Sequence, residues 1–199
     1  MEFDGTFEIE DATAEEVWLA LSDPVMIKHA LTGCEFLVEV DEGSVDFDAL
    51  ADEAAETEDP PTLPEAEPED IAERAFEEGH RYAALMKIGV GSVKPSFETI
   101  VTIDEREFPD MSASGEGSAS NSSFEMGAEM HLEETDDGVV VEWRAEADVF
   151  GRVAQMGSRV ISPVANRVVN RFFSNIEDQL RDVETDDSSS LRDRISDIL

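Results

Sequence analysis

Apolar residues recur at every fourth position along the C-terminal part of the chain. The row consists of Met156, Val160, Val164, Val168, Phe172, Ile176 and Leu180, and it is widened by Val153, Ile161, Val169 and Phe173. This spacing places the apolar side chains on one face of an α-helix, which we expect over residues 152–180. So long a stripe needs a large apolar surface to cover it, and the preceding chain must supply that surface.

Apolar and polar residues alternate in most of the preceding chain, which indicates β-strands. The expected strands are residues 3–9, 36–40, 81–88, 93–104, 111–117, 124–134 and 139–150. Tight connections, such as the turn at 136–138, favour an antiparallel meander. Between the first two strands, Thr13 and Glu16 form a capping box for one short helix, and Asp23-Pro24 starts a second.

This order of elements predicts an α+β protein. The pattern is satisfied by a helix-grip fold, in which a curved antiparallel sheet wraps around the long C-terminal helix and two short helices follow the first strand. We expect one such domain over residues 1–181. Residues 182–199 then form a polar linker and a short terminal helix, which is either a frayed tail or a docking helix for a partner groove.

Residues 41–79 interrupt the strand pattern with acid and proline. They contain 16 acidic residues and a single arginine, with prolines at 60, 61, 64 and 68. Two weak helical patches, at 47–55 and 69–78, flank the prolines. We expect an acidic, mobile insertion that is solvated and dispensable for folding.

The chain is strongly acidic as a whole. It has 199 residues, with 49 Asp and Glu against 14 Lys and Arg and a formal charge of −35. An acid excess spread over a folded domain is typical of adaptation to high salt, and an acidic protein with a basic partner is the alternative. Nucleic acid is an unsuitable ligand, because phosphate binding requires basic clusters.

Motifs of catalysis or metal binding are missing from the sequence. His29, Cys34, His80 and His131 are the only soft ligands, and no second pair completes a zinc site. We expect no metal and no covalently bound cofactor. One cysteine excludes an internal disulfide, and no signal peptide or apolar run of about 18 residues is present. We therefore expect a soluble, cytoplasmic protein.

Several blocks in order resemble one family of the START-like superfamily, the G-subunit family of carbon monoxide dehydrogenase. They are Val17-Trp18, Gly33-Cys34-Glu35, Lys87-Ile88-Gly89, Ser114-Gly115-Glu116-Gly117, and the run Gly-Arg-Val-Ala-Gln-Met-Gly-Ser-Arg at 151–159. The likeness covers about residues 1–40 and 80–180. The chain departs from the family at Thr32, where proline is usual, at 41–79, and at 118–123, where a glycine-rich segment is usual.

The resemblance implies an accessory role without catalysis. Members of the family help recruit a molybdenum-containing carbon monoxide dehydrogenase to the cytoplasmic membrane and are thought to hold a quinone-like lipid. By that analogy the partners are an apolar small molecule, a molybdenum hydroxylase and, peripherally, the inner face of the membrane. An enzyme of the same superfamily, such as a cyclase or hydrolase on apolar substrates, and a soluble lipid carrier stay open as alternatives.

A helix gripped by a sheet can enclose an apolar pocket, and we expect one along the middle of the long helix. The residues expected to line it are Phe97, Trp143, Met156, Val160, Val164 and Val168. Trp18 is expected in the core. The valines are small for central positions, so they leave room between helix and sheet.

Five arginines lie on one side of the predicted helix: Arg152, Arg159, Arg167, Arg171 and Arg181. They form either a solvated face paired with the surplus acids or a basic strip that meets anionic lipid or an acidic partner. The sequence leaves both open.

Overall fold

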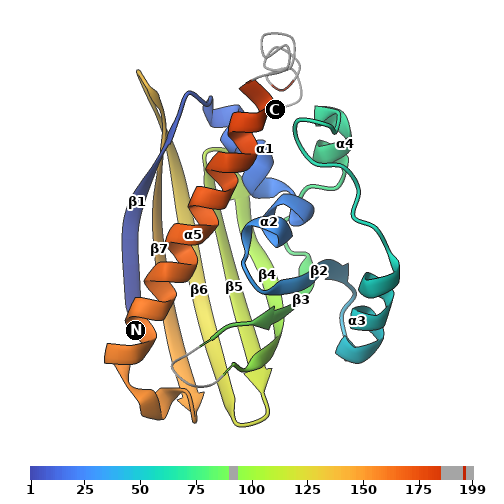
Figure 1. The fold of residues 1–199 in the computed structure, drawn as a ribbon, viewed down its shortest axis with the longest axis vertical. Helices are drawn as coiled ribbons and strands as arrows, with labels where there is room; N and C mark the ends of the chain where they lie inside the picture. Colours follow the sequence, from blue (N-terminus) through green and yellow to red (C-terminus); the bar gives the residue numbers. More distant parts are fainter. Residues whose placement is uncertain (90–93, 185–194, 196–199) are drawn as a thin grey trace.

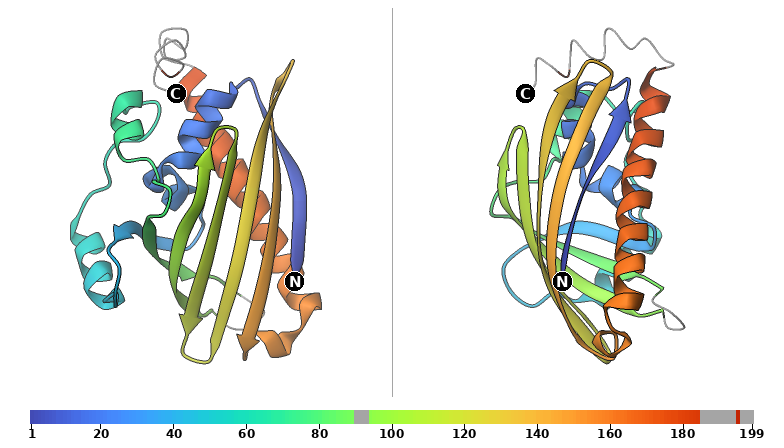
Figure 2. Two further views of the ribbon diagram at one scale, coloured as in Figure 1. Left: turned by 180° about the vertical axis from the view of Figure 1, so that it is seen from behind. Right: turned by 90° about the vertical axis from the view of Figure 1, so that its left-hand side faces the viewer.

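The protein is built around one antiparallel sheet that curls around a long helix (Figures 1 and 2). The computed structural model describes residues 1–89, 94–184 and 195. Its strands are β1 (Glu2–Glu10), β2 (Cys34–Val40), β3 (Arg81–Lys87), β4 (Ser96–Glu107), β5 (Asp110–Ala119), β6 (Ser122–Thr135) and β7 (Gly138–Gly151). The seven strands are arranged in the order β1-β7-β6-β5-β4-β3-β2. The first strand therefore pairs with the last, and the others form the predicted meander.

Two short helices, α1 (Ala14–Ser22) and α2 (Pro24–Ala30), close one end of the sheet and pack against the long helix. The capping box predicted from the sequence is present, because Thr13 and Glu16 exchange side-chain to backbone hydrogen bonds. Asp23 caps α2 by accepting a hydrogen bond from the backbone N–H of Val25 at 2.9 Å. The expected α+β helix-grip architecture is confirmed.

The long helix α5 (Ser158–Glu184) begins later than the sequence pattern predicts. Residues Ala154–Met156 form a separate 3₁₀ turn, η1, and Gly157 has a φ of 75°. A backbone in the left-handed region cannot continue a right-handed helix, so α5 starts after this glycine. Met156 consequently belongs to the turn and not to the helix, which corrects the expected start at 152.

Buried apolar side chains form two clusters along α5. The first lies at the closed end, where α1 and α2 meet the C-terminal half of α5, and it includes Trp18, Phe173, Ile176 and Leu180. The second surrounds β2, β3 and the start of β4, with Met86, Phe97 and Val153 among its members. The N-terminal half of α5 therefore faces a different part of the molecule from its C-terminal half.

The acidic segment 41–79 carries two helices, α3 (Phe47–Glu56) and α4 (Pro68–Glu73). Helix α3 packs against β2 and β3, and the Phe36 and Phe47 rings lie 6.3 Å apart. Around α4, Leu63 and Ile71 are buried in the first cluster. Burial of these side chains argues against the dispensability predicted from composition, because apolar contacts tie this half of the segment to α1. Its mobility stays a prediction.

The predicted terminal helix lies almost wholly outside the described residues. Ile195 is the exception: it is helical, 1% exposed, and part of the first cluster. Its side chain is thus buried within this chain.

Candidate ligand site between the long helix and the sheet

A row of small side chains crosses the inner face of the sheet. Ala113 on β5 pairs with Ala128 on β6, which pairs in turn with Ala145 on β7. The next row, toward the η1 end, contains Gly115, Met126 and Ala147 as neighbours. Side chains this short extend only a little way from the sheet toward α5, whereas larger residues would fill the space between them. We call residues 113, 115, 128, 145 and 147 the small-residue band.

The helix wall opposite changes character along its length. Phe173, Ile176 and Leu180, in the C-terminal half of α5, are buried. Val160, Val164 and Val168, in the N-terminal half, are only half-buried, although they belong to the same apolar row. The apolar face of α5 is therefore fully packed in its C-terminal half and partly accessible to water in its N-terminal half.

The predicted lining residues divide between the two clusters. Phe97 is a member of the second cluster, and Met156, Val160 and Val164 pack against it. Trp143 packs against the first cluster instead, and its ring lies over Gly5, where an added Cβ would meet ring atoms at 3.1 Å. Trp18 lies in the core as expected, with the Arg106 guanidinium carbon 5.4 Å from its ring centroid. The pocket itself stays a prediction.

An aromatic corner lies at the side of the small-residue band. The rings of Phe97 and Phe124 meet edge to face with centroids 5.3 Å apart. Phe124 lies over Gly117, whose missing side chain makes room for the ring. Beside Phe124, the Thr99 hydroxyl is buried and has no hydrogen-bond partner among the described residues. The corner thus combines two flat apolar surfaces with one polar atom.

Sequence reasoning missed Phe124, Thr99 and the small-residue band. The signal for the band was present as small residues at alternate positions, namely Ala113, Gly115, Gly117 and Ala119 on one strand and Ala145 and Ala147 on another. Such alternation shows which face of a strand carries small side chains. Only the strand register shows that these small residues lie side by side on neighbouring strands.

Two titratable groups with shifted pKa values, Cys34 and Asp59, are held by their own neighbours. Burial raises the pKa of Cys34 to about 11, and its thiol donates to the Phe36 carbonyl oxygen. Burial acts to raise the pKa of Asp59, but hydrogen bonds from Lys28 and His29 outweigh it and leave that pKa lowered. Within the described residues, no three His, Cys, Asp or Glu side chains gather in a way that could hold a metal ion.

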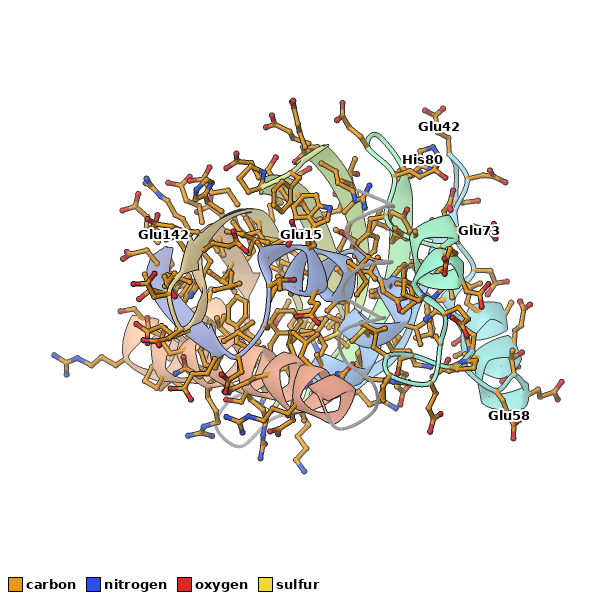
Figure 3. The ribbon with its side chains drawn as sticks, turned by 90° about the horizontal axis from the view of Figure 1, so that it is seen from above. Glu15, Glu42, Glu58, Glu73, His80 and Glu142 are labelled. Atoms are coloured by element: carbon orange, nitrogen blue, oxygen red, sulfur yellow. The ribbon has the colours of Figure 1, made fainter. Side chains whose placement is uncertain are left out.

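The outer face of the sheet is a poor site for an apolar ligand. A shallow hollow of about 390 Å³ opens there around Gly127, lined by charged residues that include Asp104, Glu129 and Arg144. Carboxylate side chains project from many elements of the molecule, as the labelled Glu15, Glu42, Glu58, Glu73 and Glu142 illustrate in Figure 3.

The outer side of α5 differs from the rest of this acidic surface. The chain has no acidic residue from 149 to 176. Arg152, Arg159, Arg167 and Arg171 are exposed, and no ion pair joins any of them to another described residue. Figure 3 shows nitrogen-tipped side chains gathered along this side of the helix.

Five of the other eight described bases form ion pairs, whereas Arg81, Lys94 and Arg106 form none with described residues. Lys28, Arg74, Lys87, Arg144 and Arg181 are all paired with carboxylates. Within the described part of the chain, pairing with surplus acids, one of the two interpretations open from sequence, therefore holds only for Arg181. We call residues 152, 159, 167 and 171 the free arginine strip. Phe150, which is 50% exposed, precedes it in the chain.

Residues 74–181 match the family described as the G subunit of carbon monoxide dehydrogenase, or CoxG. This span is more than half of the chain and runs from the end of the acidic segment to the last turns of α5. The chain belongs to the CoxG family. The match includes both walls of the candidate site, β3 to β7 and α5, so the small-residue band and the free arginine strip are features of a CoxG protein.

Solved structures show the same fold at low sequence identity. A conserved protein from Geobacillus kaustophilus has a TM-score of 0.66 and 20% identity, over 91% of this chain and 95% of that one. A protein from Thermus thermophilus has a TM-score of 0.56 and 11% identity, over 90% and 96% of the two chains. One from Rhizobium leguminosarum has a TM-score of 0.53 and 11% identity, over 91% and 94%.

These likenesses support the fold alone. No curated protein matches the sequence. Among the described residues of this CoxG protein, no helix is long and apolar enough to cross a membrane.

Proposed function

We propose that this CoxG protein is a non-catalytic accessory protein that binds a quinone-like lipid between α5 and the inner face of the sheet. The small-residue band carries this proposal, because its short side chains leave room between the sheet and the half-buried valines of α5. Binding energy would come from burial of apolar surface, at roughly 25 cal/mol per Å². A prenyl chain supplies such surface along its whole length.

The composition of the inner face supports binding rather than catalysis. None of the inward positions on β5, β6 and β7 titrates; they are Met111, Ala113, Gly115, Gly117, Ala119, Phe124, Met126, Ala128, Met130, Leu132, Val139, Val141, Trp143, Ala145, Ala147 and Val149. General acid or base catalysis requires a proton-transferring group within reach of the substrate. A cyclase or hydrolase would find no such group on these strands.

Membership of the CoxG family supports the accessory part of the proposal. The partner would be a molybdenum hydroxylase of the carbon monoxide dehydrogenase type, recruited to the inner face of the cell membrane. The free arginine strip supports the membrane part, because unpaired guanidinium groups attract anionic lipid headgroups and bind phosphate with two parallel hydrogen bonds. Genes for a molybdenum hydroxylase beside this gene would favour recruitment, and a biosynthetic cluster would favour an enzyme.

Binding is tested by the shift in melting temperature that a short-chain alkyl benzoquinone produces. A ligand at 100 times its dissociation constant stabilises the native state by about 2.7 kcal/mol, which is a shift of several degrees. Val164→Trp should remove this shift while the variant itself melts near the wild-type temperature, because the indole would occupy existing space. Ser174→Trp adds the same bulk on the exposed side of α5 and serves as the matched control.

A packed core predicts the opposite pattern. There Val164→Trp would cost roughly 1–3 kcal/mol through strain. A wild type that gains no stability from the quinone, together with a strongly destabilised Val164→Trp variant, would show that α5 is only a core element and that the ligand proposal is wrong.

A further inference from the structure

Among the described residues, the buried Thr99 hydroxyl has no hydrogen-bond partner, and the inward positions of the neighbouring strands β5 to β7 carry no ionisable side chain. The residue is 4% exposed, and its Oγ1 atom makes no hydrogen bond in the structure. Buried hydroxyl groups in folded proteins nearly always have a partner, so an exception needs an explanation. Valine has almost the same shape and would fill this position without an unsatisfied polar atom.

The hydroxyl lies on the ligand side of the sheet. Thr99 pairs with Ala84 on β3 and with Gly117 on β5, in the row next to the small-residue band. A Cβ added to Gly117 would lie 2.9 Å from the Thr99 oxygen and against the Phe124 ring, so the oxygen and the ring are neighbours on this face. Phe124 is half-buried and packs against the second cluster, so its ring is the side chain beside the hydroxyl on this face.

A ligand group can reach the hydroxyl if the Phe124 ring moves. The Phe124 ring fills the space that a side chain at Gly117 would take and meets the Phe97 ring, so its rotation is the movement that would open space beside Thr99. The uncovered corner would then present two aromatic faces to a flat ring, with a hydroxyl donor at its base. Once the ring has moved, the small side chain of Ala84 and the missing one of Gly117 leave space for the group that enters.

We propose that Thr99 is the polar anchor of the ligand and donates a hydrogen bond to a carbonyl oxygen on its ring. The ligand class is therefore a flat ring bearing an uncharged carbonyl, with an apolar tail that lies over the small-residue band. A fatty acid is a poorer fit, since none of the inward positions of β5 to β7 offers a base to pair with a buried carboxylate. This inference rests on the proposed function. That proposal concerns the apolar tail of the ligand, and this one assigns the contact made by its ring.

Thr99→Val tests the anchor with two probes of equal tail length. One probe is decyl benzoquinone, which has carbonyl oxygens, and the other is decylbenzene, which has none. The variant should bind the quinone roughly tenfold more weakly, as expected for the loss of one neutral hydrogen bond, and bind decylbenzene as the wild type does. Thr99→Ser keeps the hydroxyl and should restore quinone affinity. Thr102→Val, on the outer face of the same strand, is the control.

The fold of the variant is checked by its melting temperature without ligand. This temperature should stay the same or rise, because the change removes an unsatisfied buried group. Equal quinone affinity in wild type and Thr99→Val, or an equal loss for both probes, overturns the anchor. If neither probe binds the wild type, the proposed ligand site itself is wrong, so the two failures are distinguishable.

Discussion

Arg74 in the acidic segment and Asp23 at the start of α2 form a buried ion pair across 51 positions of sequence. The Arg74 Nε and Nη2 atoms donate to the two carboxylate oxygens of Asp23 at 2.9 Å and 2.6 Å. The Asp23 side chain is 0% exposed, whereas that of Arg74 is 21% exposed. The same arginine also donates to the carbonyl oxygen of Pro61. One side chain therefore fastens the segment to the helical end of the domain.

Arg74→Ala should destabilise the protein by about 3 kcal/mol, because it leaves a fully buried carboxylate without its cation. Urea unfolding at neutral pH measures the loss. Lys87→Ala breaks the exposed pair with Glu35 and should cost no more than about 1 kcal/mol. A loss as small for Arg74→Ala as for this control would show that the segment is not held by the pair.

The sequence predicted the domain better than it predicted this segment. Strands and helices outside 41–79 follow regular periods of two and about four residues, and each period records which face of an element is buried. Leu63, Ile71 and Phe76 are buried but follow neither period, because they are spaced eight and five residues apart, with Pro64 and Pro68 between the first two. Composition alone therefore made the segment resemble a solvated loop.

The candidate site was predictable only in part. The apolar row of α5 indicated one wall, because four-residue spacing is visible in the sequence. The small-residue band lies on three strands, so its existence depends on the register that aligns Ala113, Ala128 and Ala145. The unsatisfied Thr99 hydroxyl could not be predicted, because hydrogen-bond partners are a property of the folded chain.

The free arginine strip should be needed for binding to anionic membranes. Each basic side chain near such a surface contributes about 1 kcal/mol at moderate salt. Changing Arg167 and Arg171 together to glutamine should therefore weaken binding to vesicles with phosphatidylglycerol by about thirtyfold. Vesicle sedimentation at about 0.1 M salt measures this.

Arg144→Gln, which removes an arginine that is already paired with glutamates, is the matched control for the strip. It should leave vesicle binding unchanged. Equal losses in the strip variant and in this control, or equal binding to neutral vesicles, would exclude the strip as a membrane surface. An acidic partner protein would then be the remaining explanation for the four arginines.

Cys34 should be unreactive at neutral pH. Burial raises the pKa of its thiol to about 11, so the nucleophilic thiolate is scarce in the folded protein. Alkylation by iodoacetamide at pH 7.5 should be roughly a hundredfold slower than in the urea-unfolded chain, whose thiol has a pKa of about 8.5. The folded rate should keep rising up to about pH 11. A rate that levels off near pH 9 would contradict the raised pKa.

Stability should increase steeply with salt. Carboxylates outnumber bases, and Glu116 and Glu125 lie directly opposite each other on the outer faces of β5 and β6. Like charges in such a pair repel, and salt screens the repulsion. The melting temperature should rise from about 0.1 M to molar KCl. Glu125→Gln should raise it at low salt and reduce the slope. A flat salt series would exclude adaptation to high salt as the reason for the acid excess.

The pairing of β1 with β7 fixes when the fold can be completed on the ribosome. Residues of β2 to β7 can pair with their neighbours as they emerge, but Glu2–Glu10 must wait for Gly138–Gly151. During that delay β1 is an unpaired strand, and its inward residues Phe3, Phe7 and Ile9 are exposed to other nascent chains. Acidic side chains alternate with them at Glu2, Asp4, Glu8 and Glu10, and their mutual repulsion discourages pairing between copies. The charges that we expect to destabilise the finished protein at low salt would thus protect its first strand during synthesis.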